Sequence, residues 1–135
     1  MKDERWDAIQ PEGWVEPVGF ANGVAARGRL VFVAGQVGWD PATSTFASDD
    51  FVAQARQALA NVAAVLRAAG AEPRHLVRLT WYVTSRTEYL AARREVGEAY
   101  RALLGRHYPA MSLVVVQGLL EERAKVEIEA TAVVP

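Results

Sequence analysis

Two glutamates in the last apolar segment of the chain are the residues whose types and spacing first suggest chemistry. The segment reads KVEIEATAVVP, and residues two apart on a β-strand share a face, so Glu127 and Glu129 point the same way. The alternating Val126 and Ile128 predict a buried opposite face. Carboxylates rarely stand in so apolar a strand unless they are paired or used. The pair therefore indicates either salt-bridged interface residues or a site where a carboxylate handles a proton.

Other residue sets that commonly carry chemistry are missing from the sequence. The chain has no cysteine, which excludes thiol nucleophiles and thiolate metal sites. His75 and His107 lack metal-ligand spacing, and we expect structural roles for them at a strand start and in a turn. There is no G-x-S-x-G motif, and GQVG at 35–38 is too short to cradle a phosphate. We therefore expect neither a metal nor a cofactor.

Length and charge limit the class of protein further. The 135 residues predict one domain over 1–135, with residues 1–16 as a loose, polar lead-in. Fifteen basic and sixteen acidic residues leave a net charge of −1, so nothing favours binding to nucleic acid or to an anionic membrane. The N-terminus lacks an apolar signal region, and no apolar run approaches a membrane span. We expect a soluble, cytoplasmic protein.

The periodicity of apolar residues predicts an alternation of strands and helices. The helix over 48–69 has an apolar stripe, acidic residues at its start and Gly70 at its end. Ser85 and Glu88 form a capping box that opens a second helix ending near Gly105. Trp81 alternates with core residues in a strand. The predicted order is two extended segments within 14–41, a helix over 48–69, a strand over 75–84, a helix over 85–105 and strands over 112–117 and 125–134.

This order predicts a two-layer α+β fold, in which two helices pack on one face of a mixed β-sheet. Several strands are apolar on both faces, which is too much apolar surface to leave in water. We therefore expect a symmetric homo-oligomer that covers the face without helices.

Four segments, in this order, resemble those of the RidA (YjgF) family: GRLVFVAGQVGWDP, QARQALANVAAVLRAAGA, LVRLTWYVTS and the final PAM…KVEIEATAV. The resemblance covers about 17–134. It implies a fold like that of the trimeric chorismate mutases, with three sheets forming a central barrel and a cleft between each pair of subunits. It also implies hydrolysis of reactive enamines and imines to a keto acid and ammonia.

The same resemblance implies roles for particular residues. Gly35 stands where the family uses a backbone N–H, and Glu127 where a glutamate holds the attacking water. Phe20 takes the place of an aromatic residue that covers the ligand, and Ala34 the place of a serine. Glu129, farther along the same face, is expected to be structural.

One departure from the family pattern bears on the substrate. The arginine that follows the PA dipeptide and grips a carboxylate is Met111 here, and a thioether cannot pair with a carboxylate. Leu113 makes the pocket more apolar, and Trp39 is a further candidate for its lining. We expect an apolar or non-standard substrate rather than a simple 2-iminoacid, unless another cation such as Arg123 substitutes.

The alternative is a trimer of the same fold that binds a small molecule or a partner without catalysis. The ribonuclease activity attached to some family members finds no support, because there is neither a basic stripe nor a histidine pair.

Overall fold

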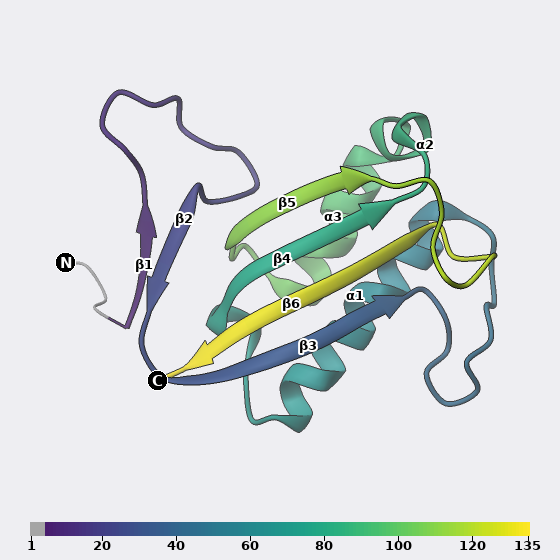
Figure 1. Cartoon of the computed structure of the whole chain (residues 1–135), viewed down its shortest axis with the longest axis horizontal. Helices are drawn as coiled ribbons and strands as arrows, with labels where there is room; N and C mark the ends of the chain where they lie inside the picture. The colour runs from purple at the N-terminus through teal and green to yellow at the C-terminus, as the bar shows by residue number, and fades with distance from the viewer. Residues whose placement is uncertain (1–4) are drawn as a thin grey trace.

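The centre of the molecule is a four-stranded mixed sheet (Figure 1). In this computed structural model, which describes residues 5–135, β6 is antiparallel to both of its neighbours, while β4 and β5 run parallel. The strands lie in the order β3 (Arg29–Val37), β6 (Val126–Val134), β4 (Leu76–Val83) and β5 (Ala110–Val115). The α+β class and the mixed sheet that the sequence predicts are confirmed.

The helices all lie on one side of this sheet (Figure 1). They are α1 (Phe51–Ala68), α2 (Arg86–Ala91) and α3 (Arg93–Leu104), and a short 3₁₀ turn, η1 (Pro73–His75), precedes β4. α1 begins at Phe51 rather than at residue 48 as predicted, because Asp50 is its N-cap and its Oδ2 accepts a hydrogen bond from the Ala53 N–H at 2.9 Å. None of the helices within residues 5–135 is long and apolar enough to cross a membrane.

The second predicted helix is correct at its start but is not one continuous helix. Ser85 caps it by accepting a hydrogen bond from the Glu88 N–H at 3.1 Å. At Ala92 the backbone leaves helical geometry, with φ −105° and ψ 6°, and α3 begins at the next residue. The break lets α3 set its own direction across the sheet, where it packs against α1.

The hydrophobic core lies between the sheet and the helices. Val126 and Ile128 of β6 are fully buried there, as their alternation with the glutamates predicts. Leu79 and Trp81 of β4 face the same side and pack against fully buried residues of α1 such as Leu59. The helix-facing side of every long strand is thus closed within one chain.

The other face of the sheet carries no helix. Leu30 and Phe32 of β3 lie on it with 60% and 74% of their surface exposed, beside the side chains of Tyr82 and Glu129. Residues 5–135 of the chain therefore leave this face open, as the sequence predicts.

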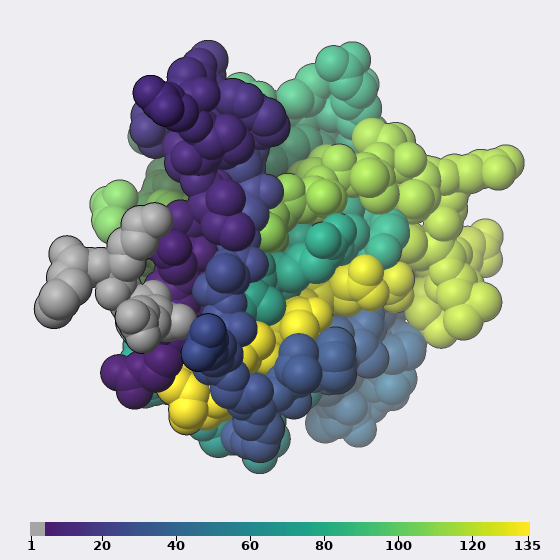
Figure 2. Space-filling view, turned by 60° about the vertical axis from the view of Figure 1, so that its left-hand side comes forward, coloured from purple at the N-terminus to yellow at the C-terminus, as the bar shows by residue number. Residues whose placement is uncertain are grey.

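A two-stranded hairpin stands beside the sheet, formed by β1 (Trp6–Ile9) and β2 (Gly23–Ala26) (Figures 1 and 2). The expectation of a loose lead-in through residue 16 is wrong for β1; residues 1–4 of that lead-in lie outside the described part. The Trp6 indole N–H donates to the Leu76 carbonyl at 2.9 Å, and its ring lies 4.6 Å from that of His107. These contacts are distant in sequence, so local composition did not reveal the strand.

The segment that joins β1 to β2 reaches the start of β5. The Ala21 N–H donates to the Pro109 carbonyl at 2.9 Å, and Ala21 forms an isolated parallel bridge with Ala110. This attachment carries Phe20, the neighbouring residue, to the outer edge of the sheet.

Candidate functional site

The side chain of Glu127 lies directly against the backbone of Gly35. The register of β3 on β6 shifts between Val33 and Gln36, so that Ala34 and Gly35 form a bulge at this point. A Cβ atom added at Gly35 would lie 2.8 Å from the Glu127 carboxyl carbon, closer than side chains normally approach. Any larger residue at position 35 would therefore displace the Glu127 carboxylate from its place against the backbone.

The two glutamates of β6 differ in their partners. The Tyr82 hydroxyl donates to Glu129 Oε1 at 2.7 Å, and this hydrogen bond raises the pKa of Tyr82. The Glu127 side chain makes no hydrogen bond or ion pair with any residue of the part of the chain that the structure describes. Its oxygens are therefore free to accept hydrogen bonds from a water molecule or a ligand, whereas Glu129 has a structural partner.

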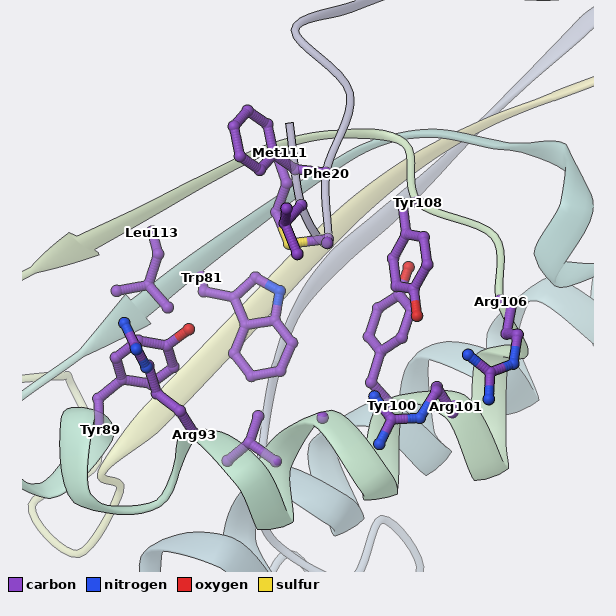
Figure 3. A pocket seen from close by; sticks show the side chains of 14 residues that line it. Phe20, Trp81, Tyr89, Arg93, Tyr100, Arg101, Arg106, Tyr108, Met111 and Leu113 are labelled. Carbon is purple, nitrogen blue, oxygen red and sulfur yellow. The ribbon is translucent and has the colours of Figure 1, made fainter. Parts of the chain in front are cut away.

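A cavity of about 610 Å³ lies on the helix side of the sheet, between β5, α3 and the segment before β2 (Figure 3). Met111 and Leu113 project into it from β5, because they pair with Leu79 and Trp81, whose side chains face the helices. Phe20 covers them from the N-terminal segment. Three of the residues predicted to bind a ligand thus lie together.

The predicted site residues fall into two groups within one chain. Gly35, Ala34 and Glu127 lie at the β3 bulge, where Glu127 shares the open face with Tyr82, its partner in the β4–β6 register. Met111 and the rest of the cavity lie on the opposite side of the sheet. A single copy of the chain therefore does not bring the carboxylate to the cavity.

Trp39 belongs to neither group. Its ring packs on Phe46 with the centroids 5.8 Å apart, and its carbonyl accepts a hydrogen bond from Asn61 at 3.0 Å. It is not among the residues that line the cavity beside Met111, so the expectation that it contributes to that lining is wrong.

Three arginines of the cavity wall were missed by the reasoning from sequence. Arg93, Arg101 and Arg106 line it, although the run around Arg93 reads as a solvated helix face. The neighbouring Arg94 does behave as a surface residue, with Glu98 3.5 Å away. The eight-residue spacing of Arg93 and Arg101, which places both on one face of a helix, is the signal that could have found them.

Arg123 does not stand near Met111's cavity. It forms an ion pair with Asp49 at 2.9 Å, and it also donates to the Phe46 carbonyl at 3.2 Å. These partners lie just before α1, and Arg123 is not among the residues that line the cavity. The cations beside the cavity are those of α3 and the turn that follows it.

The two histidines have the structural roles that were expected. His75 Nδ1 accepts a hydrogen bond from the Glu72 N–H at 3.0 Å in the turn before β4, and burial lowers its pKa. The His107 Nε2 atom lies 2.9 Å from the carbonyl oxygen of Leu76, within hydrogen-bonding distance. Within residues 5–135, no cluster of three or more histidines and acidic residues is placed to hold a metal ion.

Comparison with known proteins assigns the chain to a family. The model of the family described as Endoribonuclease L-PSP matches residues 16–134. A crystal structure of YyfB from Yersinia pestis, a protein of unknown function in the conserved Rid protein family, is 36% identical, with a TM-score of 0.84 over 96% of this chain and 99% of that one. The chain belongs to the RidA family.

Two further members of the RidA family are similar to this chain. The 2-iminobutanoate/2-iminopropanoate deaminase of Salmonella typhimurium is 38% identical over 109 residues, which cover 78% of this chain and 80% of that protein. The crystal structure of Escherichia coli TdcF with bound serine is 30% identical, with a TM-score of 0.68 over 96% of this chain and 99% of that one. Both likenesses span most of the fold.

Proposed function

We propose that this protein is a RidA-type enamine/imine hydrolase that acts on a non-standard substrate at clefts between subunits. Family membership and the deaminase from Salmonella typhimurium support the general activity. The observation that carries the proposal is the Glu127 carboxylate, which lies against Gly35 on an open sheet face without a partner among residues 5–135. The chain contains no cysteine, and we place the protein in the cytoplasm.

The assembly that we propose is a homotrimer in which the open sheet faces meet. Exposed Leu30 and Phe32 supply apolar surface for such contacts. Because Glu127 and Met111 lie on opposite sides of one sheet, a site that uses both needs two subunits. The cleft would place the Glu127 face of one subunit at the cavity of the next.

In the proposed reaction, an enamine first tautomerises to the imine, and water then adds to the carbon of the C=N bond. Glu127 holds this water and accepts its proton as the new C–O bond forms. The proton passes to the nitrogen and gives a carbinolamine. The proton of the new hydroxyl then also moves to the nitrogen, the C–N bond breaks, and ammonia leaves as the C–O bond becomes a carbonyl. The Gly35 N–H would hold a polar atom of the substrate beside the carboxylate.

The proposed substrate differs from a simple 2-iminoacid. Met111 offers no charge at the position where the family uses an arginine, and Leu113 and Ala34 add apolar surface. A two- to four-carbon iminoacid would lack its carboxylate contact, so we expect its turnover to be slow compared with that of a larger imine.

Ammonia release from a panel of imines generated in situ tests the proposal. Glu127→Gln keeps the shape of the side chain but removes the base, and we expect a loss of roughly 10²–10⁴-fold in turnover. Glu129→Gln is the matched control on the same face, and its turnover per subunit should stay near that of the unaltered protein. Loss of activity in Glu129→Gln with full activity in Glu127→Gln would contradict the assigned roles.

A second candidate is a trimer that binds a small molecule without catalysis, and Met111 in place of the arginine favours it. In that case no imine of the panel is hydrolysed faster than in buffer. Glu127→Gln then changes only the affinity for the ligand.

A further inference from the structure

The charged side chains around the cavity beside Met111 are all positive. Arg93, Arg101 and Arg106 line it, and no aspartate or glutamate does (Figure 3). The guanidinium groups of the three make no ion pair or hydrogen bond with residues 5–135. All three residues are exposed, and their combined positive charge attracts anions to this part of the surface.

An unpaired donor lies deeper in the same cavity. Only 3% of the Trp81 surface is exposed, and its indole N–H has no hydrogen-bond partner in the structure. Figure 3 shows the indole nitrogen on the side of the ring that faces Tyr108 and Met111. Buried donors are normally paired, so this N–H indicates that an acceptor atom of a ligand belongs beside it.

Gly97, one turn earlier on α3, leaves room for the side chain of Arg101. A Cβ atom added at Gly97 would lie 3.2 Å from Arg101 Nη1, so the guanidinium folds back along α3 in the space that glycine leaves. Arg101 and Arg106 lie at the Tyr108 end of the cavity, whereas Arg93 lies at the other end (Figure 3). The cavity therefore has two adjacent cations at one end.

The rest of the wall is aromatic and apolar. Phe20, Tyr89 and Tyr108 surround the Trp81 ring together with Met111. Aromatic side chains bind flat, unsaturated groups well because the faces of the rings stack on them. The body of the ligand should accordingly be planar and apolar.

We propose that this cavity binds an organic anion with a flat apolar body, whose anionic group is held by Arg101 and Arg106 and which offers an acceptor atom to the Trp81 indole N–H. This inference rests on the proposed function, because the anion would be the ligand of the proposed cleft, and it specifies the substrate class of that function. The charge lost at Met111 is replaced by cations on α3 and in the following turn. An anion held there lies farther from β5, which suits a larger acid than a simple 2-iminoacid.

Calorimetric titration with 2-naphthoate and its neutral isostere 2-naphthamide tests the charge requirement. We expect 2-naphthoate to bind at least about tenfold more tightly, because hydrogen bonds between charged groups are stronger than neutral ones. Arg101→Gln and Arg106→Gln should each remove most of this preference and leave 2-naphthamide binding unchanged. Arg94→Gln, on the same helix but outside the cavity, is the control and should alter neither. Equal affinity for the two probes would overturn the proposal.

2-Naphthyl phosphate identifies the anionic group. Once 2-naphthoate is found to bind more tightly than the amide, the tighter of the two anions identifies the preferred group as carboxylate or phosphate.

The indole N–H resonance of Trp81 provides a readout that is independent of affinity and of activity. On addition of 2-naphthoate it should move, while those of Trp6, Trp14 and Trp39 stay in place. Trp81→Phe assigns the resonance, and removal of the other three tryptophans in turn assigns it if that variant fails to fold. Saturating 2-naphthoate without a shift of the Trp81 signal would overturn the assignment of this donor.

The outcomes separate this inference from the proposed hydrolase activity. If no imine is hydrolysed but 2-naphthoate binds through Arg101, the hydrolase proposal fails and the anion site stands. If Glu127-dependent ammonia release is found but 2-naphthoate binds no better than 2-naphthamide, the hydrolase proposal stands and the anion site fails.

Discussion

The two faces of the central sheet are built from the same strands but have opposite characters. On the helix side, Val126 and Ile128 are fully buried against the helices of their own chain. On the other side, Glu127 and Glu129 alternate with them and face open surface beside exposed Phe32. The first face packs into the core, whereas on the second the Glu127 side chain has no hydrogen-bond or ion-pair partner among residues 5–135.

The largest loss of stability that we expect comes from a substitution on the helix side of the sheet. Ile128→Ala removes a fully buried side chain and should lower the free energy of unfolding by about 2–5 kcal/mol. Glu129→Gln, one residue away on the open face, weakens only the hydrogen bond from Tyr82 and should change it by about 0.5–1.5 kcal/mol. Chemical denaturation of both variants measures the difference. Similar losses in the two would mean that the open face is as tightly packed as the core.

The second prediction tests whether the open face is buried between subunits. Phe32→Glu places a charge on the surface that we propose to be buried between subunits, and burial of a phenylalanine side chain contributes about 1.5–3 kcal/mol. We expect the variant to dissociate into folded monomers in sedimentation velocity runs, while the unaltered protein sediments as a trimer. Leu120→Glu, at an exposed loop position away from this face, is the control. A trimer that persists in Phe32→Glu would place the interface elsewhere.

The smallest effect concerns the hydrogen bond between Tyr82 and Glu129 on the open face. It raises the pKa of Tyr82 above the ordinary value of 10.0, so its contribution to stability is complete below pH 10 and is lost as the pH rises through the folded value. Tyr82→Phe should therefore reduce the fall in thermal midpoint between about pH 8 and about pH 11.

Tyr100→Phe provides a comparison with the interior, because burial also raises the pKa of Tyr100. An alkaline fall that is unchanged in Tyr82→Phe would show that the hydrogen bond to Glu129 is absent in solution.

Patterns of neighbouring residues determined much of this protein from the sequence alone. The alternation in KVEIEATAVVP predicts both faces of β6, and the cap at Ser85 starts α2 where expected. These features follow from local periodicity and local hydrogen bonds, which depend on residues only a few positions apart. The resemblance of the chain to RidA proteins likewise rests on short segments, and the comparisons confirm it.

Only the tertiary structure decided that the candidate site residues lie in two groups on opposite sides of the sheet and that arginines line the cavity. The parallel pairing of β5 with β4 turns Met111 toward the helices, while the register of β6 turns Glu127 the other way. The packing of α3 then brings Arg101 to the cavity that encloses the unpaired indole N–H of Trp81. These placements depend on strand order and on contacts between residues distant in the chain, so no spacing within one segment could specify them.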